Sequence, residues 1–468
     1  MWMLAQNLGA QVSALIVFIL LARLLTPRDF GLMAMAFVVT QFLTMFASQG
    51  LISAIIQRQD LEQSHLDTAF WLNLSVGLIV AMIGMAAAPG IALLYGEPAV
   101  SQILMVLCIT VLLESLTSVQ NSILQRRMEF KNVAIRKLSG EAVGGAAGIT
   151  MALSGFGIWS LVARPIINQI TQVLLFWLLT DWRPRLLFSV PHLKDIVGYG
   201  SNVLGVNVLN FGARQFDSFL IGLFMGATVL GQYSIAKRLI MMLVDLVRGG
   251  IGSVAWTMFS RIQDQQQKLQ QGLVQLNRMV CLITFPLFIA VSLYSHHYIP
   301  LFFGEKWYAS IPIIQLLALA GFFEATRSSH ESLILATGKS GVRLMLAAVI
   351  ASANIGIFFM LYEWDIVVLS FGYGVVALVL FPFWVRATIT PIELSLGSYI
   401  KSYKEPVFAT LALVVTHFTI DALVDQPLIN PNIDFLIEIV FMGILYLAII
   451  TAINPRLLVD LIREKRKN

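Results

Sequence analysis

The chain has 468 residues, of which 58% are hydrophobic and 12% are charged, whereas a soluble domain carries about 25% charged residues. This composition excludes an ordinary soluble protein. Apolar stretches long enough to cross a bilayer recur along the whole length, which predicts an all-α polytopic membrane protein. The formal net charge of +5 gives no indication of nucleic-acid binding, because most basic residues fall in loops on one side of the predicted membrane.

The apolar pattern predicts about fourteen membrane helices, joined by connections too short to hold an extramembrane catalytic domain. The first apolar run begins almost at Met1 without a basic leader or a cleavage-like site, so it is interpreted as the first span and not as a signal peptide. The predicted spans are 3–24, 31–56, 68–95, 100–124, 135–153, 158–180, 196–224, 229–257, 277–303, 308–336, 341–362, 366–387, 403–422 and 432–452.

An internal repeat underlies this pattern. A shift of 210 positions places "ESLTSVQNS" (114–122) on "EATRSSHES" (324–332). A shift of 200 positions aligns the first two spans with spans seven and eight without a gap, and it places Leu4, Asn7, Leu20, Gly31, Ala36, Leu43 and Gly50 on Leu204, Asn207, Leu220, Gly231, Ala236, Leu243 and Gly250. Six spans per half give both halves the same orientation, as in transporters whose two lobes rock about a central cavity. We therefore expect an N-terminal six-helix lobe (1–180), a C-terminal six-helix lobe (196–388), an extra helix pair (403–452) and a basic cytoplasmic tail (453–468).

The distribution of Lys and Arg predicts the orientation of the chain in the membrane. One set of loops carries 22 of the 31 basic residues, whereas the opposite set carries only Arg23, Arg28 and Lys306. Because cytoplasmic loops are enriched in Lys and Arg, both termini are predicted to be cytoplasmic.

The seventh predicted span carries ionisable residues in its middle, where one charged group costs about 3 kcal/mol on insertion scales. Its polar residues are spaced by three, four and three positions, which places them along one helical stripe. Lipid cannot satisfy such groups, so the stripe is expected to face protein or water. The stripe consists of Asn207, Asn210, Arg214 and Asp217, and a shorter stripe on the first span consists of Asn7 and Gln11.

Further ionisable residues within the spans are either structural salt-bridge partners or groups that line a polar cavity. Arg164, Lys237 and Arg238 have no oppositely charged residue at i,i+3 and are expected to be cavity cations, with snorkelling to the outer surface as the rival interpretation for the last two. Pairs at i,i+3 can neutralise each other locally, and these are Arg214/Asp217, Asp245/Arg248 and Glu324/Arg327. The remaining groups are Glu114, Glu141, His330 and Glu331.

Sequence features of other function classes are absent. The chain contains no Walker A sequence, nucleophile elbow, zinc-protease motif or dinucleotide fingerprint, so we expect no enzyme and no cofactor. Cys108 and Cys281 lie in apolar runs and are interpreted as buried side chains, and His296–His297 lacks a second ligand pair, so no metal site is expected. Close helix packing is predicted on span five by the small-xxx-small steps of Gly140, Gly144 and Gly148.

Three segments resemble a known family. They are "LARLLTPRDFGLMAMAFVVTQFLTMFASQGLISAIIQR" (21–58), "SILQRRMEFK" (122–131) and "ILATGKSGVR" (334–343). They are similar to bacterial polysaccharide transporters, the Wzx-type lipid-linked oligosaccharide flippases of the multidrug/oligosaccharidyl-lipid/polysaccharide (MOP) superfamily, especially the colanic-acid and teichuronic-acid exporter branch.

The resemblance implies a flippase that moves undecaprenyl-pyrophosphate-linked repeat units to the outer leaflet of the bacterial inner membrane by alternating access, for O-antigen, exopolysaccharide or capsule synthesis. A diphosphate needs cationic donors, and the guanidinium fork of Arg suits phosphate. The candidate diphosphate ligands, chosen by position, are Arg164, Arg214, Arg248, Arg327, Lys237 and Arg238. The polar or acidic groups expected in the cavity are Asn7, Gln11, Asn207, Asn210, Asp217, Glu114, Asp245 and Glu324.

The implied partners are the lipid-linked oligosaccharide, membrane lipids, and a polysaccharide polymerase or glycosyltransferase; the protein itself would be a monomer. The prenyl tail would stay in lipid, along the extra helix pair. One alternative is a drug or cation antiporter of the same superfamily, which would favour an uncompensated acidic cavity. A second is a membrane glycosyltransferase or ligase, which would need a larger outer loop than this chain contains, and a third is a lipid scramblase.

Overall fold

The computed structural model describes residues 2–57, 62–423 and 431–453. Within these ranges the side chains of 2–8, 48–54, 56–57, 130, 190–210, 213, 250–254, 423 and 431–433 are not described. The contacts divide the chain into two compact units, Met1–Ile235 and Ala236–Asn468, and each unit is considered by itself. The lobe limits expected from the repeat stay a prediction, and the expected basic tail lies almost wholly outside the described residues.

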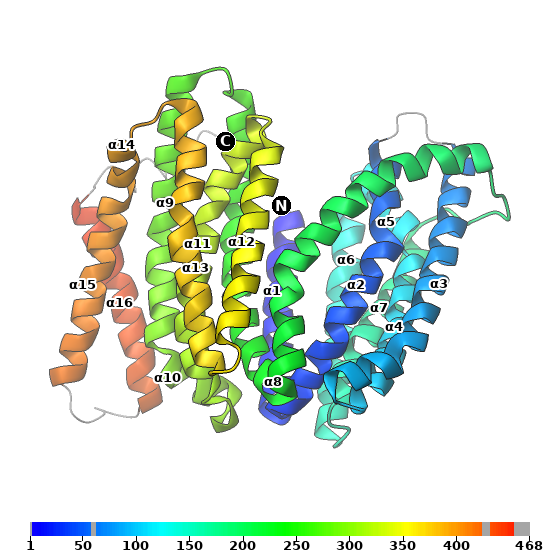
Figure 1. The fold of residues 1–468 in the computed structure, drawn as a ribbon, viewed down its shortest axis with the longest axis horizontal. Helices are drawn as coiled ribbons and strands as arrows, with labels where there is room; N and C mark the ends of the chain where they lie inside the picture. The colour runs from blue at the N-terminus through cyan, green and yellow to red at the C-terminus, as the bar shows by residue number, and fades with distance from the viewer. Residues whose placement is uncertain (1, 58–61, 424–430, 454–468) are drawn as a thin grey trace. The chain divides into compact units, whose positions relative to one another are not determined.

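The first unit is helical throughout its described regular structure, and α2, α3 and α4 pack against one another while α6 packs against α1 and α7. Its helices, drawn from blue to green in Figure 1, are α1 (Trp2–Leu24), α2 (Pro27–Gln57), α3 (Gln63–Tyr95), α4 (Ala99–Ser115), α5 (Ser118–Arg126), α6 (Phe130–Leu153), α7 (Trp159–Leu179) and the first part of α8 (Val190–Arg261).

The second unit begins within α8. Here α11 packs against α9 and α13, and α15 lies against both α9 and α16. Its further elements are α9 (Gln266–Leu293), α10 (Ser295–Tyr298), η1 (Ile299–Phe303), η2 (Glu305–Trp307), α11 (Ser310–Ala336), α12 (Ser340–Leu361), α13 (Ile366–Ile389), η3 (Thr390–Ile392), α14 (Leu396–Ile400), η4 (Lys401–Tyr403), α15 (Lys404–Leu423) and α16 (Pro431–Ile453).

Local sequence signals explain where α2 and the second arm of α8 begin. Thr26 and Asp29 form a reciprocal cap, in which Asp29 Oδ2 accepts from the Thr26 amide at 2.9 Å and the Asp29 amide donates to Thr26 Oγ1 at 3.3 Å, and Pro27 occupies the first helical position, where a missing N–H costs nothing. In α8, Gly226 adopts φ 85° and ψ 175°, a conformation open essentially to glycine alone. Gly226 therefore separates two arms, which correspond to the predicted spans seven and eight.

Ten helices among the described residues are long and apolar enough to cross a bilayer, and between 11% and 50% of each such span is buried inside the protein. At least half of the residues in each such window are therefore at least partly accessible, as is expected of helices that contact lipid. The chain is a multi-pass membrane protein. The count of fourteen spans stays a prediction. Predicted span four comprises α4 and α5, which together form one candidate span, Ala99–Arg126.

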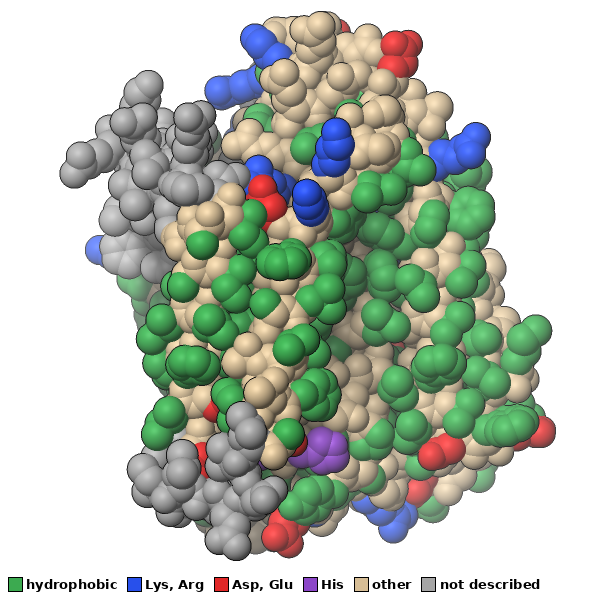
Figure 2. All heavy atoms as spheres, turned by 90° about the vertical axis from the view of Figure 1, so that its left-hand side faces the viewer, with side chains coloured by type: hydrophobic (Ala, Val, Ile, Leu, Met, Phe, Trp, Pro, Cys, Tyr) green, Lys and Arg blue, Asp and Glu red, His purple; other side chains and the backbone are tan. Residues whose placement is uncertain are grey.

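The outward faces of the helices are apolar. On α15, the side chains of Phe408, Leu411, Val415 and Phe418 are each more than half exposed. Figure 2 shows hydrophobic side chains spread over this face, with Lys and Arg gathered near its upper end. An exposed apolar surface of this kind marks a membrane-facing side rather than a water-facing one.

The small-xxx-small steps of α6 produce the close packing that they predict. A Cβ atom at Gly144 would lie 2.8 Å from the carbonyl oxygen of Arg164 on α7, and one at Gly148 would lie 3.3 Å from that of Ser160. Only glycine permits this approach, so the prediction of close helix packing is confirmed. Cys108 and Cys281 are buried free thiols, as expected.

Candidate functional site

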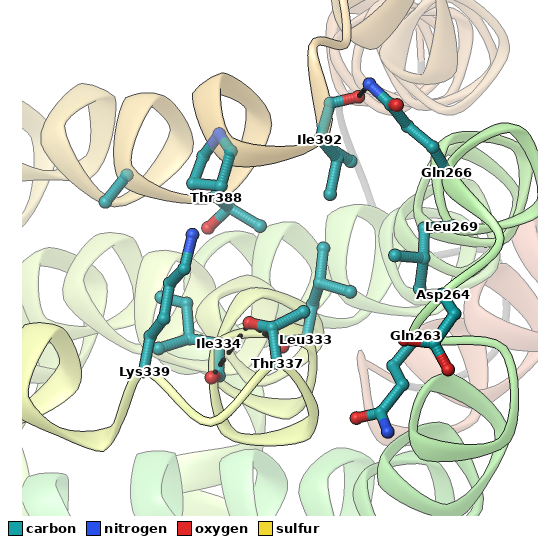
Figure 3. A pocket seen from close by; sticks show the side chains of 12 residues that line it. Gln263, Asp264, Gln266, Leu269, Leu333, Ile334, Thr337, Lys339, Thr388 and Ile392 are labelled. Atoms are coloured by element: carbon teal, nitrogen blue, oxygen red, sulfur yellow. Dashed lines mark hydrogen bonds between the residues drawn. The ribbon is translucent and has the colours of Figure 1, made fainter.

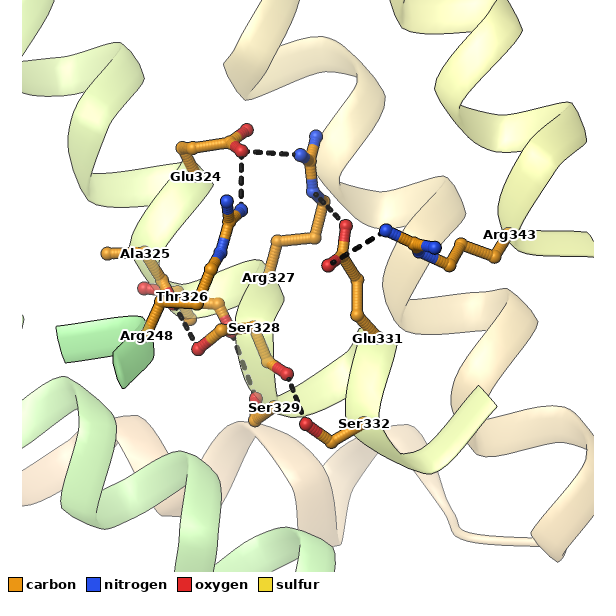
Figure 4. A network of polar contacts seen from close by, with 10 residues as sticks. All are labelled: Arg248, Glu324, Ala325, Thr326, Arg327, Ser328, Ser329, Glu331, Ser332 and Arg343. Atoms are coloured by element: carbon orange, nitrogen blue, oxygen red, sulfur yellow. Dashed lines mark hydrogen bonds and ion pairs between the residues drawn. The ribbon is translucent and has the colours of Figure 1, made fainter. Parts of the chain in front are cut away.

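A ladder of alternating charges runs from α8 across α11 to α12 in the second unit (Figure 4). Glu324 Oε1 lies 2.6 Å from Nη2 of Arg248 and 2.6 Å from Nη2 of Arg327. Glu331 extends the row, with Oε1 3.3 Å from Arg327 Nε and Oε2 3.9 Å from Arg343 Nη2. These five residues are called the arginine ladder below.

The ladder confirms one predicted pair and replaces another. Glu324 and Arg327 are paired at i,i+3, as their spacing indicates. Arg248 makes its ion pair with Glu324 of α11, and the exposed Asp245 adds only a weaker electrostatic attraction. Contacts between helices thus decide the partner of Arg248, and sequence spacing alone does not contain that information.

The ladder carries more positive than negative charge. Three guanidinium groups face two carboxylates, and the side chains range from 16% exposed for Arg327 to 37% exposed for Arg343. The Arg327 guanidinium also lies over the ring of Trp384, 4.8 Å from its centroid, a cation–π contact that restrains its orientation. Arg327 Nε is too poorly aligned with Glu331 for a hydrogen bond, so we regard that contact as electrostatic. The arrangement can attract an anion and offer it forked donors.

The hydroxyl groups beside the ladder are occupied within α11 itself. Thr326, Ser328, Ser329 and Ser332 each donate to a backbone carbonyl three or four residues earlier, at 2.7–2.9 Å. Local bonds of this kind satisfy hydroxyl groups within a helix. The hydroxyl protons of these four residues are therefore used within α11.

A second charged group lies in the first unit, between α6 and α7. Arg164 Nη2 lies 3.0 Å from Glu141 Oε2, and Asn168 Nδ2 donates to Glu141 Oε1 at 3.0 Å. Gln172 continues the row by donating to Asn168 Oδ1. Arg164 has no acidic neighbour at i,i+3 in the sequence, but α6 supplies one. It is therefore a paired cation with its side chain 15% exposed.

The acidic residue in the middle of α8 is bound to the other arm of the same helix. Asp217 Oδ2 accepts from the Tyr233 hydroxyl at 2.6 Å, and Oδ1 accepts from the Ser218 amide at 2.7 Å. Tyr233 lies beyond Gly226, so this bond joins the two arms. Arg214 is exposed, and its predicted pairing with Asp217 stays a prediction.

The other predicted site residues are distributed over both units. Lys237, Gln11 and Glu114 are half-buried and Arg238 is exposed. The side chains of Asn7, Asn207 and Asn210 lie outside the described residues. A ligand role for any of these groups stays a prediction.

His330, one of the ionisable residues in the predicted spans, belongs to a buried structural network. Its Nε2 lies 2.7 Å from the Tyr399 hydroxyl, which in turn lies 2.5 Å from that of Tyr403. Asn277 Nδ2 donates to Ser402 Oγ at 2.9 Å. These bonds tie the α14–α15 segment to α9 and α11.

A cavity of about 250 Å³ lies apart from the ladder, between the α8–α9 turn, the α11–α12 turn and the end of α13 (Figure 3). Lys339, Thr337 and Thr388 line it, and Gln266 Nε2 donates across its edge to the Ile392 carbonyl at 3.2 Å. None of the predicted ligand residues contributes to this cavity.

Sequence reasoning missed three partners. These are Arg343 as a partner of Glu331, Trp384 as a partner of Arg327, and Tyr233 as a donor to Asp217. Each lies on a different helix or helix arm from its partner, so only the packing of the helices brings the two side chains together. Glu141, an acidic residue within the predicted span 135–153, is the sequence signal that indicates a partner for Arg164.

Comparison with known proteins identifies the family. Residues 20–312 match the family described as polysaccharide biosynthesis protein, which is more than half of the chain. The chain belongs to this polysaccharide biosynthesis protein family. The resemblance of segments 21–58 and 122–131 to polysaccharide transporters is thereby confirmed.

Relatives of this polysaccharide biosynthesis protein align along most of its length. The teichuronic acid biosynthesis protein TuaB of Bacillus subtilis is 24% identical and covers 99% of this chain and 97% of its own. The succinoglycan biosynthesis transport protein ExoT of Rhizobium meliloti is 26% identical over 76% of this chain and 72% of its own. The lipopolysaccharide biosynthesis protein WzxC of Escherichia coli is 24% identical over 69% and 66%.

Solved structures show the fold of this polysaccharide biosynthesis protein. The lipid II flippase MurJ in its inward closed conformation superposes with a TM-score of 0.78 at 13% identity, covering 97% of this chain and 98% of its own. An inward-facing multidrug resistance MATE transporter of the MOP superfamily gives a TM-score of 0.57 at 18% identity, over 84% and 94%. The predicted fold class is confirmed.

Proposed function

We propose that this protein is a flippase that moves undecaprenyl-pyrophosphate-linked oligosaccharide repeat units from the cytoplasmic to the outer leaflet by alternating access. The repeat units would serve the synthesis of a cell-surface polysaccharide such as O-antigen, exopolysaccharide or capsule. The observation that carries the proposal is the alignment with TuaB over 99% of the chain. The fold shared with a lipid II flippase and the transport role named for ExoT support it, and they favour a transporter over an enzyme.

The arginine ladder is the proposed diphosphate site of the second unit. Three guanidinium groups share two carboxylates, so an arriving diphosphate can compete with Glu324 and Glu331 for donors that are already gathered. Hydrogen bonds between Arg and phosphate are frequently bidentate and about twice as strong as neutral ones. Trp384 keeps the Arg327 fork oriented during this exchange. Arg164, held by Glu141, is the corresponding candidate in the first unit.

The proposed setting is the bacterial plasma membrane, with both termini cytoplasmic, as the uneven distribution of Lys and Arg favours. Two six-helix lobes (1–180 and 196–388) would alternate access, and the helix pair 403–452 would guide the prenyl tail. The protein would act as a monomer and hand its cargo to a polysaccharide polymerase or glycosyltransferase.

The competing function is a drug or cation antiporter, which the shared fold with a MATE transporter favours. An antiporter of cations needs carboxylates that are available to bind the cation. In the ladder, Glu324 contacts two arginines and Glu331 contacts two. This excess of positive charge fits an anionic cargo better.

The test is a deletion strain of the source bacterium whose lipid fraction is analysed chemically. A flippase predicts that undecaprenyl-pyrophosphate-linked repeat units accumulate and that the wild-type gene restores surface polysaccharide. Unchanged lipid-linked intermediates combined with a new sensitivity to cationic drugs would instead identify an antiporter.

A further inference from the structure

The connection between α7 and α8 (residues 180–189) has almost no regular structure, yet it is fixed firmly to the first turns of α3. The Arg185 amide donates to Asp67 Oδ1 at 3.1 Å, and the Arg185 carbonyl accepts from Trp71 Nε1 at 2.7 Å. Two further bonds are Ser189 N to Thr68 Oγ1 at 3.2 Å and Gln63 Nε2 to the Arg183 carbonyl at 3.4 Å.

Through these bonds, protein groups satisfy backbone N–H and C=O groups of the connection, so these groups do not need water. Irregular backbone is tolerated near a bilayer only where protein or water satisfies its N–H and C=O groups. Asp67 and Thr68 are both 0% exposed, so these two acceptors are protein groups enclosed by protein. The connection can therefore lie where little water is present, as at the edge of a bilayer.

The opposite side of the connection is apolar and exposed. Leu186 is 88% exposed, Leu187 53% and Phe188 54%. Near the end of α7, Leu174 and Leu178 are likewise 59% and 79% exposed. Leaving these side chains in water would cost about 25 cal/mol for each Å² of apolar surface, whereas lipid would cover them.

A basic group adjoins this apolar row. Arg183 donates back to the carbonyls of Thr180, Trp182 and Trp177 and so closes the end of α7. Arg185 is exposed directly beside Leu186. Apolar side chains next to Lys or Arg are the pattern of segments that lie in the interface of an anionic membrane.

We propose that residues 185–188 are a membrane-surface anchor: Leu186, Leu187 and Phe188 insert at the headgroup boundary, and Arg185 binds the headgroup of an anionic phospholipid. The leaflet is the one on the side of the basic loops. Because α8 begins at Val190, the anchor fixes the depth at which this helix enters the membrane. The inference requires only that the chain spans a membrane, and it does not depend on the proposed cargo.

The experiment places an environment-sensitive fluorophore on a single added cysteine in the full chain, reconstituted in nanodiscs. Leu186→Cys and Leu187→Cys are the test positions, so a folding failure of one leaves the other. Asp181→Cys in the same connection and Asp264→Cys in the α8–α9 turn are aqueous controls, both being exposed acidic residues. The unaltered chain gives the background, because Cys108 and Cys281 are buried.

Insertion predicts blue-shifted emission at 186 and 187, strong quenching by lipids brominated on the acyl chain, and weak quenching by aqueous iodide; the two controls should show the reverse. Iodide quenching at 186 and 187 as strong as at 181 and 264 would overturn the anchor, because the apolar row would then lie in water.

The headgroup is tested with the same probes by comparing brominated phosphatidylglycerol with brominated phosphatidylcholine at equal mole fraction. We expect stronger quenching by the anionic lipid. Arg185→Gln should lower that preference by up to about five-fold, since one basic residue near an anionic surface is worth about 1 kcal/mol. Arg127→Gln is the control, because this exposed arginine lies beside Glu129 in another connection and should leave the preference unchanged. An unchanged preference in Arg185→Gln, or none in the wild type, would refute headgroup binding.

Discussion

Gly31 and Gly231 occupy equivalent positions in the internal repeat, and each lies against the backbone of the segment that carries the other. A Cβ atom at Gly31 would lie 1.6 Å from the carbonyl oxygen of Ala227, and one at Gly231 would lie 1.8 Å from that of Pro27. Ala227 and Pro27 are themselves equivalent under the shift of 200 positions. This reciprocity is what a two-fold relation between two hairpins produces, and it gives the weak sequence repeat a physical counterpart.

The first prediction concerns this crossing. Gly31→Ala and Gly231→Ala should each destabilise the protein by about 1–3 kcal/mol, because the added methyl group meets a backbone carbonyl that cannot move without shifting a helix. The measurement is the thermal unfolding midpoint in detergent, together with the amount of protein in the membrane.

Gly90→Ala in α3 is the matched control. No atom lies within 4 Å of a Cβ placed there, so this variant should be neutral or slightly more stable. Equal behaviour of Gly31→Ala and Gly90→Ala would show that the crossing is not tightly packed.

The second prediction concerns the arginine ladder. Arg327→Lys keeps the charge but loses the fork that contacts Glu324, Glu331 and the Trp384 ring, so export should fall several-fold at normal abundance. Arg127→Lys is the control, because this arginine lies outside the ladder, its ion pair with Glu129 is 3.9 Å long and its side chain is 57% exposed. Complementation of surface polysaccharide, normalised to protein abundance, is the measurement. Equal losses in both variants would argue against a specific role for Arg327.

The third prediction distinguishes a structural role of Arg164 from a ligand-binding role. Removing one partner of the Glu141–Arg164 pair should lower stability by about 1–3 kcal/mol, less than a fully buried pair because both side chains keep some solvent contact. The double change Glu141→Gln and Arg164→Gln should restore abundance, since no unpaired charge remains. If export by the double variant also returns, Arg164 has a structural role. We expect export to stay low.

The sequence was sufficient for the fold class because the signals are local. Apolar runs, Gly226 between two spans and the glycine steps of α6 all depend on neighbouring residues. The partners of charged residues were harder, because they depend on distances between helices. Glu324 and Arg327 share one helix and were paired correctly, whereas Arg248 and Arg164 take their partners from other helices.

The same contrast explains the connection at 180–189. Arg183 and Arg185 are visible as basic loop residues in the sequence. Their different roles are not visible in the sequence, because Arg183 closes the end of α7 with three carbonyl contacts while Arg185 points outwards. Hydrogen-bond partners, which the tertiary structure decides, distinguish two exposed arginines that composition treats alike.

The last prediction returns to the charges in the middle of α8. Tyr233→Phe removes the hydroxyl donor of Asp217 and should cost about 1.5–3 kcal/mol, the usual value for a hydrogen bond to a charged group. Adding Asp217→Asn to the Tyr233→Phe variant should recover part of that loss, because the side chain at position 217 is then no longer charged. Positions 17 and 33, the repeat equivalents of 217 and 233, are Val17 and Met33, so this bond belongs to the second hairpin alone.

Arg214 is then tested against Asp217. If Arg214 serves only to neutralise Asp217, exchanging both for Asn should be tolerated, since replacing an ion pair outright is often near neutral whereas removing one partner is costly. We expect instead that the double variant reaches normal abundance and fails to export, and that Arg214→Lys exports only in part because its charge remains but its fork is lost. Export complementation alongside abundance decides the matter. Full export by the double variant would make Arg214 a structural residue and would leave the arginine ladder and Arg164 as the remaining diphosphate candidates.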